Sequence, residues 1–121
     1  MTTPLHQVKA DFFKTLGHPI RIRVLELLSE REHAVSEMLP HVQVEPSHLS
    51  QQLAVLRRAG LVTTRKEGSG VYYSLTSSHV AELLTQARII LTTVLVGQAE
   101  LLEDLRADAE AARSGDRTAA Q

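Results

Sequence analysis

Apolar residues recur every three or four positions in three segments of the first half of the chain, residues 6–16, 19–30 and 33–42. This period places the apolar side chains of each segment on one side of a helix, so we predict three amphipathic helices. Gly17 separates the first two, Pro19 suits a first helical turn, and Pro40 limits the third helix to about two turns. The residues expected to face the core are Val8, Phe12, Phe13, Leu16, Ile20, Val24, Leu27, Leu28, Val35, Met38 and Leu39.

A fourth helix is predicted within residues 45–62, EPSHLSQQLAVLRRAGLV, and its two ends differ in character. Its first turns carry short hydrogen-bonding side chains, whereas Gly60 marks its end. Its apolar positions are Leu49, Leu53, Val55 and Leu56. The following segment, LVTTRKEGSGVYYSL, alternates around EGSG, which is typical of a β-hairpin with a flexible glycine tip.

A long helix is predicted from Ser78 to about Leu105. Its apolar stripe contains Val80, Leu84, Ala87, Leu91, Val94, Leu101 and Leu105, and it is broken once, by Gln98. Such a helix is about 40 Å long, which is more than one small domain can cover. The polar, Ala-rich tail is expected to be disordered. We therefore predict one domain over residues 1–105 and a disordered tail over residues 106–121.

The predicted order is four helices, a hairpin and a long helix. The third and fourth helices, joined by QVEPS, have the lengths of a helix-turn-helix, and the hairpin directly after them forms a wing. The predicted fold class is therefore mainly α with a small β-hairpin wing (α+β), a winged helix-turn-helix.

Composition excludes several kinds of site. The 121 residues include no cysteine, so disulfides, thiolate metal ligands and cysteine nucleophiles are excluded. We find no apolar signal core and no run approaching the roughly 18 apolar residues of a membrane span. We therefore expect a cytoplasmic protein with no membrane partner.

The overall net charge of −1 conceals an uneven distribution. Residues 45–75 contain four basic and two acidic side chains, a local charge of +2. Residues 98–121 contain six acidic and three basic side chains, a local charge of −3. Since a partner responds to the local potential, the helix and hairpin of residues 45–75 can face an anionic partner.

The polar start of the fourth helix favours DNA recognition. A helix that enters the major groove reads base edges with its N-terminal residues, and Gln and Ser are suitable donors and acceptors. The alternative is that these residues only cap the helix, with Ser47 as the N-cap. The arginines at the end of this helix and the polar hairpin residues are expected to meet the DNA backbone. The predicted DNA-binding residues are Ser47, His48, Ser50, Gln51, Gln52, Arg57, Arg65, Lys66 and Ser69.

Three stretches resemble the ArsR/SmtB bacterial repressors: FFKTLGHPIRIRVLELL, SHLSQQLAVLRRAGLV and RKEGSGVYYSL. The resemblance covers roughly residues 8–105. It implies a homodimer, joined through the first and last helices, on a palindromic operator. The dimer-interface residues expected from it are Phe12, Leu84, Ala87, Leu91, Val94 and Leu101.

Many relatives of this kind sense metals, and two common sites can be compared with this sequence. A Cys-Val-Cys-type motif corresponds to Ala34, Val35 and Ser36, where both thiols are replaced. A site on the last helix corresponds to Ser77, His79, Ile90 and Thr93, where one ligand of four remains. We therefore predict no cofactor, with a nonstandard nickel or zinc site at His6, His79 and Glu82 as the alternative. His18 is expected to be structural, and His33 and His41 are expected at the surface.

The sequence leaves two classes of function open. The first is a sequence-specific repressor controlled by an effector other than a thiolate-bound metal, such as a small molecule or a partner protein. The second is a protein-interaction or dimerisation module built on the long helix. An enzyme is rejected, because no nucleophile, base and acid occur at a workable spacing and no glycine loop is suited to phosphate.

Overall fold

The computed structural model describes residues 2–119, with side chains as far as residue 114. The chain divides into two compact units, Met1–Leu84 and Thr85–Gln121. The domain boundary at residue 105 stays a prediction, and the first compact unit ends near the start of the long helix.

Four helices of the first unit agree with the predicted pattern: α1 (Leu5–Leu16), α2 (Pro19–Glu30), α3 (Val35–Val42) and α4 (Pro46–Arg58). Gly17 ends α1 and Pro19 opens α2, as predicted. His18 is the N-cap of α2, and its Nδ1 accepts a hydrogen bond from the backbone N–H of Ile20 at 3.2 Å. This bond satisfies an N–H that a helix start otherwise leaves unpaired, so the structural role expected for His18 is confirmed.

The core of the first unit is aliphatic. Its most deeply buried side chains are Val24, Leu25, Met38, Leu49, Leu53 and Leu56. All but Leu25 were predicted from the apolar stripes. Val8 and Phe13 of α1 are instead exposed, so the apolar face of this helix is only partly covered by its own chain.

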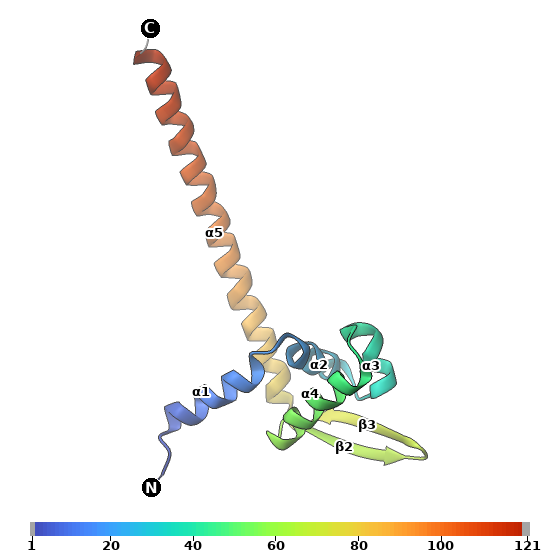
Figure 1. The fold of residues 1–121 in the computed structure, drawn as a ribbon. Coiled ribbons are helices and arrows are strands. Elements are labelled where there is room, and N and C mark those ends of the chain that lie inside the picture. The colour runs from blue at the N-terminus through green and yellow to red at the C-terminus, as the bar shows by residue number, and fades with distance from the viewer. Residues whose placement is uncertain (1, 120–121) are drawn as a thin grey trace. The chain divides into compact units, whose positions relative to one another are not determined.

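The sheet has three antiparallel strands in the order β1-β3-β2, formed by β1 (His33–Ala34), β2 (Val62–Glu67) and β3 (Gly70–Leu75). The predicted hairpin is confirmed as β2 and β3, and Figure 1 shows it as a two-stranded ribbon beside α4. The two-residue strand β1 was not predicted. It pairs His33 with Tyr73 and buries the imidazole to 3% exposure, so the expectation of a surface His33 is wrong. His41 is exposed, as expected.

The turn between α3 and α4 gives the helix-turn-helix its shape. Gln43 follows α3 with a φ of 54°, in the left-handed region that ends many helices. Pro40 lies inside α3, which is eight residues long. The chain then extends through Glu45 and enters α4 at Pro46, whose fixed φ suits the first helical position.

The last helix, α5 (Ser78–Ala119), is 42 residues long and runs well beyond Leu105. A disordered tail was predicted over residues 106–121, whereas residues 106–119 continue α5, and residues 120–121 lie outside the described part. In the first unit, Val80 is buried and Leu83 and Leu84 pack against the core. In the second unit, large apolar side chains are exposed: Ile89, Ile90, Leu91, Val94, Leu95, Val96, Leu101, Leu102 and Leu105.

The composition of α5 has a second consequence. Its segment Ser78–Ser114 is long and apolar enough to cross a membrane, with a mean hydropathy of 1.5 over its best 18-residue window. The sequence predicts no such segment, because its apolar residues form no uninterrupted run: threonines and charged side chains lie between them. Length and composition alone do not distinguish a bilayer from a protein partner as the cover for this surface.

Candidate nucleic-acid interface

The polar start of α4 faces solvent, while its opposite side holds the helix in the core. Leu49, Leu53 and Leu56 are buried, whereas Ser47, Ser50 and Gln51 are exposed. The buried leucines recur at i, i+4 and i+7, which fixes the rotation of the helix about its axis. The exposed side chains of the first two turns are thus presented together on a rigid support.

The N-terminus of α4 has no side-chain cap among its described neighbours. Glu45 is the N-cap residue, and its side chain accepts no capping hydrogen bond. Ser47 lies one residue inside the helix, after Pro46, so the alternative that Ser47 is the N-cap is wrong. The hydroxyl of Ser47 and the positive end of the helix dipole remain available to an anionic partner.

His48 lies at the edge of this surface. Its side chain is half-buried, and its ring meets that of His18 edge to face, with 6.3 Å between the ring centroids. His18, the N-cap residue of α2, therefore packs against the His48 side chain of α4. Only the exposed part of the His48 ring can contact a partner.

Gln52, also predicted to contact DNA, does not belong to the exposed set. It is only 9% exposed, and its Oε1 accepts a 2.7 Å hydrogen bond from Nε of Arg21. The same guanidinium donates from Nη1 to the carbonyl oxygen of Thr15 in α1, at 3.1 Å. Gln52 thus joins α4 to α2 and, through Arg21, to α1, with its Oε1 already used and little of its side chain exposed.

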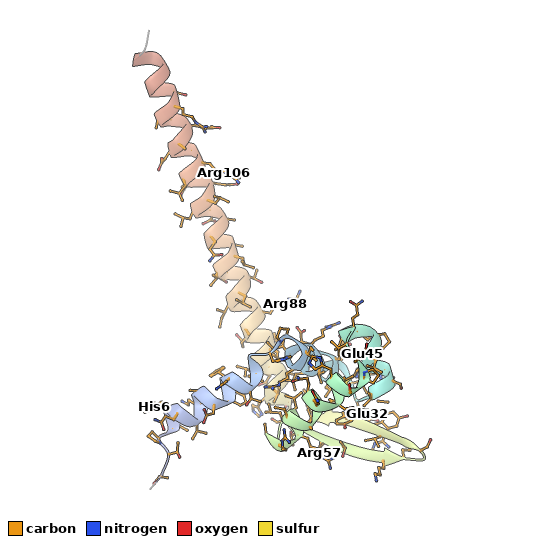
Figure 2. The ribbon with its side chains drawn as sticks, viewed as in Figure 1. His6, Glu32, Glu45, Arg57, Arg88 and Arg106 are labelled. Carbon is orange, nitrogen blue, oxygen red and sulfur yellow. The ribbon has the colours of Figure 1, made fainter. Side chains whose placement is uncertain are left out.

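The predicted basic residues lie at the far end of α4 and on the hairpin. Arg57 is exposed in the last turn of α4, and Figure 2 labels it at the other end of the helix from Glu45. Lys66 and Ser69 are exposed on the hairpin. Arg65 is also exposed, but its guanidinium is held by two carboxylates, those of Glu32 and Glu67. These positive side chains therefore differ in how free they are to meet a phosphate.

Sequence reasoning missed Glu32. It lies just before β1, 33 residues from Arg65 in the chain, and its Oε1 is 2.6 Å from Nη2 of Arg65. This guanidinium holds the pKa of the Glu32 carboxyl below its ordinary value. No local signal identifies such a pair, because it depends on β1 joining the edge of the sheet.

The predicted dimer residues fall into two groups. Phe12 and Leu84 are partly buried against the core of their own chain, so only part of each side chain is free. The remaining four lie in the second unit and are exposed: Ala87, Leu91, Val94 and Leu101.

The weak metal candidates do not form a cluster. His6, His79 and Glu82 are each exposed. His79 Nδ1 lies 3.0 Å from the hydroxyl of Ser77, which itself accepts a hydrogen bond from the His79 backbone N–H. Among the residues that the structure describes, no three His, Asp or Glu side chains lie close enough together to hold a metal ion.

A hollow of about 390 Å³ lies against α5 and is lined by Thr85, Arg88, Ile89, Thr92 and Thr93. The hydroxyls of Thr92 and Thr93 donate to the carbonyl oxygens of Arg88 and Ile89, one turn earlier. These two polar groups are thus already used within the helix, and the hollow offers a ligand mainly apolar surface.

The carboxylates that order β1 and α3 predict how stability depends on pH. Glu37 accepts a 2.9 Å hydrogen bond from the backbone N–H of Ala34, which lowers the pKa of its carboxyl below the ordinary value of 4.5, as Arg65 does for Glu32. A lowered pKa in the folded state adds stability above the unfolded pKa, and this stability is lost as pH falls. We expect the melting temperature to fall between about pH 6 and pH 3.

Thermal unfolding followed by circular dichroism measures this dependence. E32Q/E37Q should melt lower than the wild type at neutral pH and show a flatter profile in the acid range. E30Q, which alters an exposed acid at the end of α2, should keep the wild-type slope. A double variant whose profile matched the wild type would contradict the assignment of these two carboxylates.

The comparisons with known proteins agree with this architecture. Residues 18–64 match the model of the family described as "Bacterial regulatory protein, arsR family". An uncharacterised HTH-type transcriptional regulator of Mycobacterium tuberculosis, Rv0081, is 53% identical over 89% of this chain and 96% of its own length. Its crystal structure matches with a TM-score of 0.76 over 81% of this chain and 99% of that chain.

More distant relatives share the same elements. The biofilm growth-associated repressor of Xylella fastidiosa is 37% identical over 69% of this chain and 74% of its own length. The solution structure of the homodimeric winged helix-turn-helix DNA-binding domain of Mb0332 from Mycobacterium bovis is 31% identical. It covers 75% of this chain and 83% of that chain, with a TM-score of 0.66. The predicted resemblance and the predicted winged fold are confirmed: this chain belongs to the ArsR family of bacterial transcriptional regulators.

Proposed function

We propose that this protein is a cytoplasmic, homodimeric repressor that binds a palindromic operator through α4 and the wing. The observation that carries the proposal is the exposed polar start of α4, mounted on buried leucines. Ser47, Ser50 and Gln51 are free of the protein interior, while Leu49 and Leu53 anchor the same turns. In helix-turn-helix proteins this end of the second helix reads base edges in the major groove.

The chemistry of these side chains suits base recognition. Gln51 can donate and accept at once, which allows a bidentate contact with adenine. Ser50 lies beside it and can contact a base or a phosphate, and Ser47 lies at the uncapped helix start. Arg57, in the last turn of α4, and Lys66, on β2, are exposed cations and are suited to backbone phosphates. The half-buried His48 can offer DNA only the exposed part of its ring, and the buried Gln52 is not part of the proposed interface.

A homodimer accounts for the exposed apolar residues of α1 and α5. Val8 and Phe13 on α1, with Leu91 and Val94 on α5, are large side chains that an isolated chain would leave in water. The relative from M. bovis forms a homodimer with the same fold. Two-fold symmetry would place two α4 helices about 34 Å apart, one turn of DNA, and would require a palindromic site.

Repression is the proposed direction of control, because the relative from X. fastidiosa is a repressor. The effector is proposed to be something other than a thiolate-bound metal, since the chain contains no cysteine. Three kinds of effector agree with this proposal: a small molecule, a partner protein, and nickel or zinc bound by histidines. A reporter gene behind the protein's own upstream region measures the direction, and its expression should fall when the protein is present.

The rival proposal is a docking module that uses the apolar face of α5 and binds no operator. The exposed leucines of α5 favour it, but they do not explain why the start of α4 is polar, exposed and uncapped. A stable dimer without any DNA preference would favour this rival.

A gel shift tests the proposed function. The purified protein is titrated onto DNA from its own upstream region and onto a scrambled sequence of equal composition. We expect a shift only with the upstream DNA, and its loss in S50A/Q51A. S36A, a serine exposed on α3, is the matched control and should bind like the wild type. Added chelator, nickel or zinc shows whether a metal changes the complex. Equal shifts on both DNAs would overturn the operator proposal.

A further inference from the structure

Arg65 links strand β2 to Glu32, the residue directly before β1, across the middle strand β3. It lies on β2, directly opposite Tyr72 of β3, and Tyr72 in turn pairs with Ala34 of β1. The guanidinium carbon is 5.1 Å from the centroid of the Tyr72 ring. Beyond this ring it reaches Glu32, whose side chain Figure 2 labels beside the sheet. One side chain thus connects the wing to the segment that leads out of α2.

All three guanidinium nitrogens of Arg65 contact a carboxylate. Nη2 donates to Oε1 of Glu32 at 2.6 Å, and Nε lies 3.4 Å from the other oxygen of that carboxylate. Nη1 donates to Oε2 of Glu67 at 2.5 Å. Each terminal nitrogen therefore already carries a carboxylate, and the planar fork of the guanidinium fits this arrangement.

The charges of this group oppose a phosphate. One positive and two negative side chains leave Glu32, Arg65 and Glu67 with a combined charge of −1. A phosphate that approached Arg65 would meet both carboxylates at short range and would have to displace them. Lys66 differs: successive residues of a strand point to opposite faces, so its side chain leaves the face that Arg65 shares with Tyr72. Lys66 forms no ion pair within the described residues.

We propose that Glu32 and Arg65 form a clasp that holds the wing and keeps Arg65 off the DNA. Arg65 is then a positioning residue, Lys66 makes the phosphate contact of the wing, and Glu32 limits how strongly the wing is attracted to DNA. This inference rests on the proposed function, because it assigns roles within the same DNA complex. It differs from the sequence prediction, in which Arg65 itself meets the backbone.

The salt dependence of binding separates the two roles. Each phosphate neutralised by a protein cation adds about 0.9 to the slope of log affinity against log salt concentration. A residue that only positions the wing changes affinity without changing this slope. The slope therefore reports whether Arg65 itself is on a phosphate.

The test measures fluorescence anisotropy of labelled upstream DNA over a series of KCl concentrations. R65Q should keep the wild-type slope, and K66Q should lower it by about 0.9. E32Q should raise the slope by about the same amount, because Nη2 of Arg65 becomes free to contact a phosphate while Glu67 still holds Nη1. This rise should disappear in E32Q/R65Q. E30Q removes an equal charge from the end of α2 and should leave the slope unchanged.

Two results would overturn the clasp: a slope lowered by about 0.9 in R65Q, or an unchanged slope in E32Q. Circular dichroism establishes that each variant is folded. If E32Q does not fold, E32A replaces it in the test. Failure of the proposed function has a different signature. In that case the wild type shows no preference for its upstream DNA in the gel shift, whatever its salt slope.

Discussion

Replacing Leu91 and Val94 together by aspartate is expected to convert the dimer into a folded monomer whose operator affinity is at least about 100-fold weaker. Both side chains are exposed in the single chain, at 58% and 46%, so the change leaves the core of the first unit intact. In a dimer the two new carboxylates of each chain would be buried without partners, which is strongly unfavourable. A monomer also loses the gain in affinity that comes from two linked reading helices, a factor of about 100 or more.

Sedimentation equilibrium gives the mass, and anisotropy on the operator gives the affinity. The matched control is I89D/V96D, which introduces the same charges into the same stretch of α5. At 3.6 residues per turn, Ile89 and Val96 lie on the side of the helix opposite Leu91 and Val94, so this variant should remain a dimer. L91D/V94D that stayed dimeric would show that a different surface joins the two chains. A monomer with wild-type affinity would show that one α4 is sufficient for binding.

The first of these results also bears on the membrane-like composition of α5. A helix inserted in a bilayer would be disturbed by charge on any side, whereas a helix paired with a second chain would be disturbed on one side. Different behaviour of the two aspartate variants is therefore evidence for a protein partner. If L91D/V94D and I89D/V96D lost the dimer and the operator affinity equally, the result would favour a helix that is covered on all sides.

Periodic burial is the part of this structure that sequence alone predicts well. The apolar stripes of α2 and α4 repeat with a helical period because one side of each helix packs against the core. The glycines and prolines near the helix termini mark where the helices begin and end. The hairpin follows from alternation around a glycine turn, where Gly68 adopts a φ of 61°. The DNA-binding hypothesis followed from the order of these elements.

The errors share a different physical origin, which is that they depend on contacts between distant segments. Strand β1 has two residues and exists only because Tyr72 and Tyr73 present a free edge to it. His33 is buried for the same reason. Glu32 enters the site through a partner 33 positions away. The length of α5 was underestimated because a polar, Ala-rich segment has high helix propensity but no apolar stripe to reveal it.

Gln51 and Gln52 show the limit most directly, since they are identical and adjacent but point in different directions. A rotation of 100° along the helix takes the side chain from solvent at Gln51 to the hydrogen bond with Arg21 at Gln52. Composition cannot separate the two, because glutamine suits both a base edge and a buried amide site. Only the leucines around them decide which residue faces inward.

The two glutamines should therefore respond oppositely to the same substitution. Q51A is expected to weaken operator binding by about 1–3 kcal/mol, a factor of about 5 to 150, with an unchanged melting temperature. Q52A is expected to lower the free energy of unfolding by about 1–3 kcal/mol, because Arg21 loses its partner between α2 and α4. At a temperature where it is fully folded, Q52A should still prefer the operator to scrambled DNA by the wild-type ratio.

Urea unfolding and anisotropy on both DNAs, carried out on each variant, complete the comparison, and each glutamine serves as the control for the other. A loss of sequence preference in Q52A with normal stability would mean that the helix turns on binding and that Gln52 reaches a base. A destabilised Q51A with normal preference would mean that the exposed face of α4 is structural. The opposite responses of two neighbouring glutamines would instead locate the reading surface to within one residue along the helix.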